Sequence, residues 1–298
     1  MDVKIIFLTL YVFITCINGQ SYMYDVYEGA VIPAVTHWGY GDYNGPEEWP
    51  ELFPNKCAGK YQSPVNIRPR KTKFKPNLSK FIFYDPPYWG ARYFAHNNGH
   101  TIQVNTWGLH LLANGGLNHT YKIAQFHFHW GDENDQGAEH TVNEKAAPME
   151  MHIVSWNHEK YESIKDAAKA PDGLAVLGVL FKISHRDNPI FEPLIHAIPS
   201  IRDPDWNNRV EIAVVPIRNY LPHSPEKYFR YRGSLTTPRC YESVTWTVFR
   251  EKQSISKRQL NIFRQALTSA HSNEEPNGND KLYADFYGYG KGKLFPFI

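Results

Sequence analysis

The sequence predicts a mostly β fold with a few helices, in a single domain. Short segments that alternate or run apolar recur between turns rich in Gly, Pro and Asn, which is typical of strands. Only two segments space their apolar residues as a helix does. No repeat, low-complexity linker or change in composition marks a second domain, so we expect one domain of about 260 residues. The 42% hydrophobic and 15% aromatic content is sufficient for its core.

The individual elements follow from these patterns. Strands are expected within 81–104, 109–112, 121–129, 149–156, 175–183, 210–215 and 243–249. Helices are expected at 161–168 and 256–268. The second helix begins at Ser256, a favourable N-cap, and places Leu260, Phe263 and Leu267 at helical spacing.

The N-terminus has the pattern of a secretory signal peptide. Lys4 precedes an apolar run over 5–17, and the small residue Gly19 follows it. The run has about 13 residues, fewer than the roughly 20 that span a bilayer, and no later segment is long and apolar enough to span. We therefore expect a signal peptide at 1–19, a mature chain that begins near Gln20, and a secreted, extracellular protein without a membrane span.

Charge and cysteine content narrow the class of protein. The 32 basic and 30 acidic residues give a net charge of +2 without a long run of one sign, so no nucleic-acid partner is expected. Once Cys16 leaves with the signal peptide, Cys57 and Cys240 remain as an even pair in an oxidising compartment, which favours a disulfide over two buried free thiols. Asn77 and Asn118 begin glycosylation sequons, so a glycoprotein is expected.

Two alternating segments suggest a metal centre. His127 and His129 lie two residues apart in QFHFHW (125–130), and MEMHIV (149–154) places Glu150 and His152 on one strand face. Three imidazoles would leave Zn²⁺ one open position for water, as in a catalytic site, and Gln125 and Glu150 could accept the outer ring protons. Taken alone, a His-x-His pair is more often just the polar face of a strand. No His-Glu-x-x-His helix or Gly-rich phosphate loop is present, which removes support for the usual metalloprotease and phosphate-binding layouts.

Further motifs occur in a recognisable order: SPVNI (63–67), NNGH (97–100), EHTV (139–142) and GSLTTP (233–238). Together with the two histidine segments, they closely resemble the α-class carbonic anhydrases over about residues 38–263. Cys57 and Cys240 are placed similarly to the disulfide of the extracellular branch. The resemblance implies a zinc lyase that interconverts carbon dioxide and bicarbonate, built on a large, mainly antiparallel twisted sheet. We expect the catalytic domain to span 20–272, between the signal peptide and the divergent tail.

The resemblance assigns roles to individual residues. A zinc-bound hydroxide would donate its proton to Thr236, which would donate to Glu139, and His100 would carry the product proton to solvent. Tyr40, Asn98 and Gln103 would order the intervening water. The substrate pocket would be lined by Val154, Val176, Leu235, Thr236, Thr237 and Trp246.

Two departures from the family pattern bear on function. The Asn-x-Arg-Pro-x-Gln segment that normally supplies an acceptor for the middle zinc ligand is absent, and 280–290 stand in its place, which leaves the outer partner of His129 undefined. Arg239 replaces a common proline near the cleft. The divergent tail, 273–298, supports an alternative hypothesis: an extracellular matrix or binding protein that retains the fold, linked to biomineralisation. No protein partner can be read from the sequence.

Overall fold

The computed structural model describes the backbone of residues 14–17, 20–23, 26–27 and 30–31, and the chain over 38–41, 44–205 and 207–266. The chain divides into two compact units, Met1–Trp38 and Gly39–Ile298. In the first unit, β1 (Ile14–Ile17) pairs antiparallel with β2 (Gln20–Met23), and β3 (Val26–Tyr27) pairs antiparallel with β4 (Ala30–Val31). The sequence analysis did not predict these strands. The rest of the predicted signal peptide, 1–13 and 18–19, lies outside the described residues, so its removal stays a prediction.

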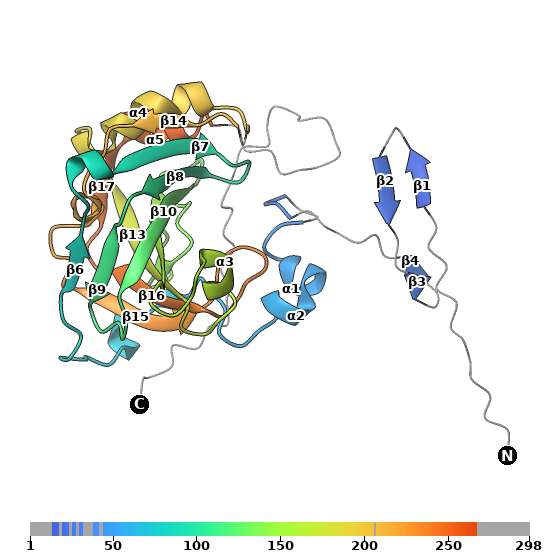
Figure 1. Cartoon of the computed structure of the whole chain (residues 1–298), viewed down its shortest axis with the longest axis horizontal. Coiled ribbons are helices and arrows are strands. Elements are labelled where there is room, and N and C mark those ends of the chain that lie inside the picture. The colour runs from blue at the N-terminus through green and yellow to red at the C-terminus, as the bar shows by residue number, and fades with distance from the viewer. Residues whose placement is uncertain are drawn as a thin grey trace, which may run out of the picture. The chain divides into compact units, whose positions relative to one another are not determined.

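A single large sheet organises the described part of the second unit (Figure 1). Eight of its strands follow the order β14-β7-β8-β10-β12-β13-β16-β15, while β17 pairs with β13, and β9 pairs with both β10 and β6. The bounds are β6 (Phe81–Tyr84), β7 (Arg92–Asn97), β8 (Ile102–Trp107), β9 (Leu111–Asn114), β10 (Tyr121–Trp130), β12 (Met149–Trp156), β13 (Leu174–Ser184), β14 (Val210–Ile212), β15 (Tyr228–Gly233), β16 (Val244–Phe249) and β17 (Gln253–Ser256). A separate parallel pair joins β5 (Asn66–Ile67) to β11 (Thr141–Val142).

The predicted fold class, mostly β on a mainly antiparallel sheet, is confirmed. Only β13 departs from antiparallel pairing within this sheet, because it pairs parallel with β16 and β17. Its first eight residues, Leu174 to Phe181, are all buried. A central strand covered on both faces reads as a continuous apolar run, which explains why β13 lacks the alternation of β10.

The helices are short. They are α1 (Trp49–Leu52), α2 (Pro54–Cys57), α3 (Ile164–Ala167), α4 (Glu192–Ala197) and α5 (Lys257–Phe263), together with 3₁₀ turns η1 (Pro69–Lys71), η2 (Tyr88–Gly90), η3 (Pro189–Phe191), η4 (Ile198–Ile201) and η5 (Ile217–Tyr220). The predicted N-cap is confirmed for α5: the Ser256 hydroxyl accepts from the Gln259 backbone N–H, and the Gln259 side chain accepts from Ser256 N–H in return. The expected continuation to 268 passes the last described residue.

The predicted elements lie at the positions where the structure has elements, but several of their lengths differ. The segment 161–168 contains a helix only at Ile164–Ala167, with Ser163 as its N-cap. The segment 81–104 contains two whole strands and the start of a third, separated by turns. Strands β15 and β17 were missed because Arg230 and Arg232 interrupt the apolar pattern of β15, and β17 is a short polar segment that owes its pairing to β13.

The core explains why the histidines share one face of β10. Phe126 and Phe128 are fully buried in the larger apolar cluster, where Phe128 contacts Phe191 and Phe263 of the α4–α5 layer at the top of Figure 1. His127 and His129 therefore point to the opposite face, as the alternation predicts. A second apolar cluster, which includes Val176 and Trp246, lies on that side.

A disulfide joins Cys57 at the end of α2 to Cys240, as the sequence predicted, with Cα atoms 5.0 Å apart. The Cys240 backbone N–H donates to the Thr237 carbonyl. The bond thus ties α2 to the loop that carries Thr236 and Thr237. Among the described residues, no helix has the length and apolar character needed to cross a membrane.

Candidate metal centre

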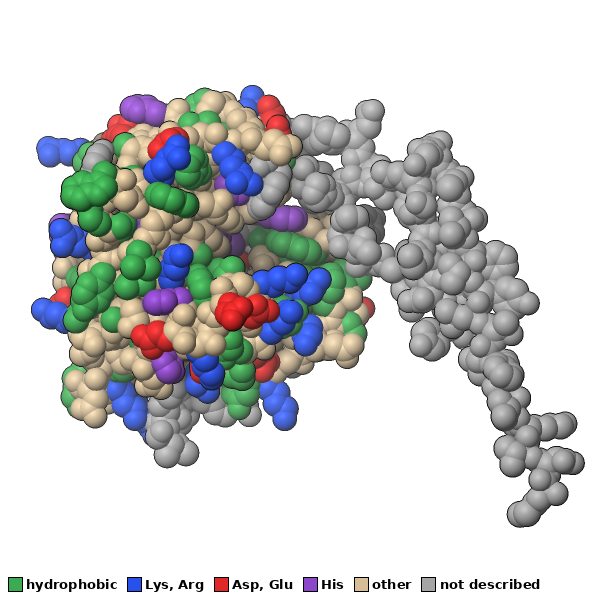
Figure 2. All heavy atoms as spheres, viewed as in Figure 1, with side chains coloured by type: hydrophobic (Ala, Val, Ile, Leu, Met, Phe, Trp, Pro, Cys, Tyr) green, Lys and Arg blue, Asp and Glu red, His purple; other side chains and the backbone are tan. Residues whose placement is uncertain are grey.

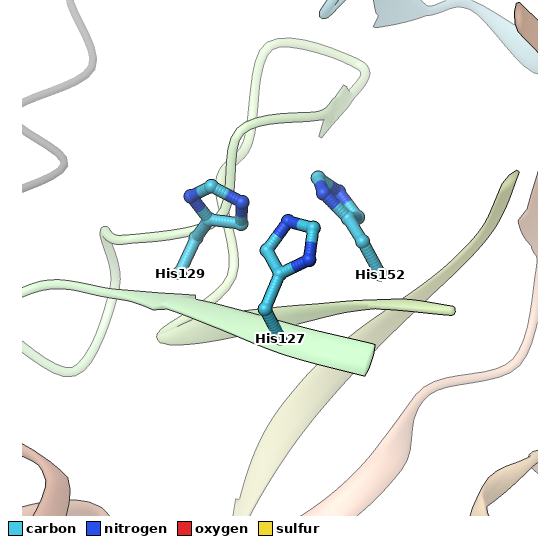
Figure 3. A group of neighbouring side chains, drawn as sticks. All are labelled: His127, His129 and His152. Atoms are coloured by element: carbon cyan, nitrogen blue, oxygen red, sulfur yellow. The ribbon is translucent and has the colours of Figure 1, made fainter. Parts of the chain in front are cut away.

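Three histidines converge on one point above the sheet (Figure 3). His127 and His129 come from β10, and His152 comes from β12. One nitrogen from each ring lies within 4.8 Å of the others, and the ring centroids are 4.6 to 5.2 Å apart. The predicted ligand set is therefore brought together, which a chance His-x-His pair on a polar face would not require.

The register of the sheet produces this convergence. His127 lies opposite His152 in the β10–β12 pair and opposite Gln103 in the β10–β8 pair. Directly opposed residues on neighbouring strands project from the same face. On the next strand the partner of His152 is Gly178, where a Cβ would lie 2.9 Å from the Glu150 carboxylate. Glycine at this position leaves room for the group that holds His152.

The outer ring nitrogens of two histidines have the partners that the sequence predicted. His127 Nδ1 lies 2.9 Å from Gln125 Oε1, and His152 Nε2 lies 2.9 Å from Glu150 Oε1. With these protons donated outward, His127 Nε2 and His152 Nδ1 are the nitrogens left to bind a cation.

All three imidazoles are held in the neutral form that binds metal. Burial, with repulsion from His152, lowers the pKa of His127 to about 3. Burial and the two neighbouring rings lower the pKa of His129 well below its usual value, and burial also lowers that of His152. At neutral pH the cluster carries no positive charge of its own to oppose a cation.

His129 differs from its two neighbours. It is 2% exposed, yet neither ring nitrogen makes a hydrogen bond to any described residue. Its Nδ1 lies 3.3 Å from Glu139 Oε1. Buried polar atoms without partners are costly, and a bound cation would satisfy one of these two. The family segment that normally supplies an acceptor for this histidine is absent from the sequence. Among the described residues, the Glu139 carboxylate lies near the His129 ring without forming a hydrogen bond to it.

Glu139 and Thr236 meet beside the triad. A hydrogen bond joins the Thr236 side chain to Glu139, and both residues are buried. Glu139 Oε2 lies 3.7 Å from His152 Nδ1. Burial and repulsion from Glu150 raise the pKa of Glu139 well above its usual range, while the bond to Thr236 acts in the opposite direction. A divalent cation nearby would further favour the charged carboxylate.

Sequence reasoning missed a buried relay behind His152. Glu150 accepts from the His140 backbone N–H at 2.8 Å and lies 2.7 Å from the His140 ring, whose Nε2 lies 2.6 Å from the Tyr231 hydroxyl. Tyr231 in turn donates to Ser63 Oγ at 2.9 Å. The position of His140 next to Glu139 in EHTV was the available signal, but only the acid was given a role.

His140, Glu150 and His152 form a second group with metal-ligand spacing. Their facing atoms already bond to one another, because Glu150 Oε1 contacts both rings. Burial alone would raise the pKa of Glu150, but the attraction of His140 and His152 and their hydrogen bonds hold it well below its usual range. This group is a charged support for His152 and has no vacant donor for a cation.

An apolar wall stands next to the triad. Val154 pairs across the sheet with Val176, which pairs with Trp246, so the three side chains form one row on the histidine face. They are at most 6% exposed, and Leu235 packs against the same cluster. Trp246 is fixed by its indole N–H, which donates to the Ser234 carbonyl at 2.9 Å. The predicted pocket residues are thus adjacent, with Thr237 next to Thr236 in the loop.

Of the predicted water-chain residues, Asn98 lies in the turn before β8, Gln103 lies in β8, and Tyr40 lies in the segment before α1. Asn98 Oδ1 accepts from the backbone N–H groups of His100 and Thr101, and its amide donates to Gln103. His100 is partly exposed. Tyr40 lies close enough to Glu139 for that charge, after burial, to raise the pKa of the phenol well above its usual value. The turn therefore joins a partly exposed imidazole to the strand that neighbours His127.

The remaining sequence-predicted residues lie on the surface. Asn77 and Asn118 are exposed, as a glycosylation site requires. Arg239 is also exposed, and its guanidinium donates to the Tyr241 hydroxyl at 3.5 Å. The face shown in Figure 2 is hollowed near its centre, with histidine side chains visible in the hollow.

Comparisons with known proteins agree with this geometry. The family model for eukaryotic-type carbonic anhydrases matches residues 44–286. Carbonic anhydrase 7 from Mus musculus and carbonic anhydrase 7 from Homo sapiens are each 38% identical over 241 residues, which is 80% of this chain and 88% of the relative. The range matched by the family model contains the three histidines, Glu139 and Thr236, whereas Tyr40 lies before it.

Proposed function

The chain belongs to the eukaryotic-type carbonic anhydrase family, and on that premise we propose that it catalyses the reversible hydration of carbon dioxide to bicarbonate and a proton, with one Zn²⁺ held by His127, His129 and His152. The observation that carries the proposal is the convergence of three imidazoles, of which His129 and His152 are buried and His127 is partly buried, while His127 and His152 have their outer nitrogens already bonded. Imidazole nitrogens are ligands that Zn²⁺ prefers.

The residues fit this metal in number and in kind. Three neutral nitrogen donors leave a tetrahedral cation one open position, the arrangement of a catalytic site. Both ring nitrogens of His129 are buried and lack a hydrogen-bond partner, and a cation bound to one of them would satisfy that nitrogen. A bound zinc ion acts as a Lewis acid toward water at that position, an effect for which carbonic anhydrases are the reference case.

Thr236 and Glu139 orient the water or hydroxide that attacks the substrate. When Thr236 donates its single proton to an ionised Glu139, its oxygen can only accept further hydrogen bonds. A water or hydroxide beside the triad must then donate to Thr236, so its lone pair points away from Thr236. We place the substrate on that side, against Val154, Val176 and Trp246, because both carbon dioxide and this row of side chains are apolar.

Proton removal is assigned to His100. Hydration releases a proton that must reach solvent for the next cycle, and His100 offers a partly exposed imidazole to carry it. Asn98 holds the His100 turn and links it to Gln103, which lies opposite His127. Water along this polar path would carry the proton outward, and Tyr40 lies near Glu139.

We place the enzyme outside the cell. The support is the signal-peptide pattern of 1–19 together with the disulfide of Cys57 and Cys240, since disulfides form and persist in oxidising compartments. Export is tested by expressing the full chain in eukaryotic cells and sequencing the N-terminus of any protein in the medium. An N-terminus near Gln20 is expected, and retention of the intact chain inside the cell would contradict export.

The activity is tested by measuring carbon dioxide hydration with purified protein before and after treatment with a zinc chelator. Rapid hydration that is lost with the metal and restored by Zn²⁺ is expected. Wild-type protein with full zinc and no hydration would contradict the proposal. The alternative, a matrix-binding function linked to biomineralisation, rests on 273–298, which lie outside the described residues, and it stays a hypothesis.

A further inference from the structure

A basic groove lies away from the metal centre. Its volume is about 1320 Å³, and it runs between the segment after β5, the turn at 116–119 and strand β15. Nine Lys or Arg residues line it, against two acidic residues, Asp172 and Glu226. None of the three histidines of the metal centre lines the groove.

The segment 68–80 supplies much of this charge. It contains six Lys or Arg residues and no Asp or Glu, a local excess of positive charge that the net charge of the whole chain does not reveal. Strand β15 and the chain around it add Lys227, Arg232 and Arg250 from the other side. A concentration of one charge in a molecule whose net charge is only +2 indicates a local binding function.

Six of the nine basic residues that line the groove have no acidic partner among the described residues. Within the part of the chain that the structure describes, Arg70, Lys71, Lys73, Lys227, Arg232 and Arg250 are exposed and form no ion pair. Of the two acids, Asp172 is already engaged by Lys160 at 2.7 Å. An anion that enters the groove therefore meets a surplus of available positive charge.

Arg230 on the floor of the groove gives an independent indication. Its guanidinium donates to the Gly115 carbonyl at 2.7 Å and to the Thr247 hydroxyl at 2.9 Å and lies near the rings of Phe81 and Tyr228, but no described carboxylate pairs with it. Burial lowers the pKa of Arg230. A half-buried cation without a counter-ion is unfavourable, and a bound anion would supply one.

We propose that this groove binds a linear sulfated polysaccharide. A chain of closely spaced sulfates matches a concave, strongly basic surface, and the concavity disfavours a flat anionic bilayer, even though Phe74 is 89% exposed among the lysines. Among the aromatic residues that line the groove only Phe74 is strongly exposed, and a single ring gives successive nucleic-acid bases no series of stacking platforms. The extracellular location proposed above would bring the groove to such polymers.

The two glycosylation sequons bear directly on this proposal, because Asn77 and Asn118 both line the groove. Glycans at either position would stand at its rim. The test therefore uses protein secreted by eukaryotic cells, both as secreted and after enzymatic removal of N-glycans. Binding in both forms is expected. Binding only after deglycosylation would overturn the proposal for the protein as it exists.

The probe is a fluorescent heparin dodecasaccharide, followed by anisotropy in about 0.15 M NaCl. The triple variant Lys71→Gln, Lys73→Gln, Lys227→Gln should bind on the order of 100-fold more weakly, because each basic residue near an anionic surface contributes several-fold to affinity. The control variant carries Lys165→Gln, Lys182→Gln and Lys257→Gln, three exposed lysines outside the groove, and should bind within about twofold of wild type.

Besides binding only after deglycosylation, four results would overturn the proposal. They are no binding by the wild type, equal weakening in the two triple variants, equal binding of a desulfated chain, and tighter binding of DNA or of anionic vesicles. Carbon dioxide hydration is measured on the same samples and should be equal in all of them. The experiment can therefore reject the proposed binding function of the groove without rejecting the proposed enzymatic activity, and the reverse.

Discussion

His127 and His152 are direct neighbours across the β10–β12 pair, with ring centroids 5.2 Å apart. Two donors on adjacent strands of a packed sheet are held by many backbone hydrogen bonds, so their separation is set before any cation arrives. The third donor, His129, stands on β10 two residues beyond His127. Preorganisation of this kind favours fast and tight metal binding.

Replacing Glu150 tests the support behind the triad. Glu150→Gln keeps the size of the side chain but removes the charge that holds His140 and His152. Zinc affinity, measured by competition with a chelator, should fall about 10- to 100-fold. Gln125→Glu is the opposite control, because a carboxylate should still accept from His127. Unchanged affinity in Glu150→Gln would show that His152 needs no such partner.

Replacing Thr236 tests whether this residue orients the attacking water or hydroxide, separately from metal binding. Thr236→Ala removes the hydroxyl that bonds Glu139, and kcat for hydration should fall on the order of 100-fold while zinc content stays equal to that of wild type. Thr236→Ser keeps the hydroxyl and should retain most of the activity. Equal kcat in the Ala and Ser variants would remove Thr236 from the mechanism.

The role of the apolar row in substrate binding can be tested by enlarging one of its side chains. Val154→Phe should fill the space beside Val176 and Trp246 and lower kcat/KM for carbon dioxide at unchanged zinc content. The matched control is Val154→Ile, a smaller increase in volume on the same strand, which should have a weaker effect. Full activity in the Phe variant would mean that the substrate approaches from elsewhere.

The disulfide should stabilise the fold. Its two cysteines are separated by 183 residues, and closing a loop of that length contributes up to about 5 kcal/mol in the chain-entropy model. The variant Cys57→Ser, Cys240→Ser should therefore unfold at lower denaturant concentration than wild type. Wild type in reducing buffer should approach the variant. If the midpoints of denaturation agree in oxidising buffer, the bond contributes nothing to stability.

The metal-free protein should lose stability as the pH falls from neutral toward 3. His127 has a pKa of about 3 in the folded chain and an ordinary value near 6.5 when unfolded, so the unfolded state binds more protons between these values. The slope from this group reaches about 1.4 kcal/mol per pH unit. The variant His127→Gln should show a shallower decline of unfolding free energy. Parallel curves for the two proteins would contradict the assignment.

Sequence reasoning was strongest where one strand carries the pattern. The alternation of β10 correctly placed His127 and His129 on one face, and two-residue spacing correctly gave Gln125 and Glu150 as partners. What it could not give depends on pairing between distant segments. The contact of Tyr231 with His140 needs the parallel placement of β16 beside β13, with β15 beyond it, and no local pattern encodes that order.

The basic groove shows the same limit at the surface. Residues 68–80 are visibly basic in the sequence, but Lys227, Arg230 and Arg232 are more than 140 residues away along the chain. Their convergence appears only once β15 folds next to the segment. Whole-chain net charge, which led us to expect no polyanionic nucleic-acid partner, averages such a region away.

The central claim, that three imidazoles hold a catalytic zinc ion, is tested most directly by anomalous diffraction at the zinc edge from crystals of the purified protein. The account predicts one strong peak about 2.0–2.1 Å from His127 Nε2, His152 Nδ1 and one nitrogen of His129, with the fourth position facing solvent. A peak between His140 and Glu150, a fourth protein ligand, or no zinc in active protein would contradict it.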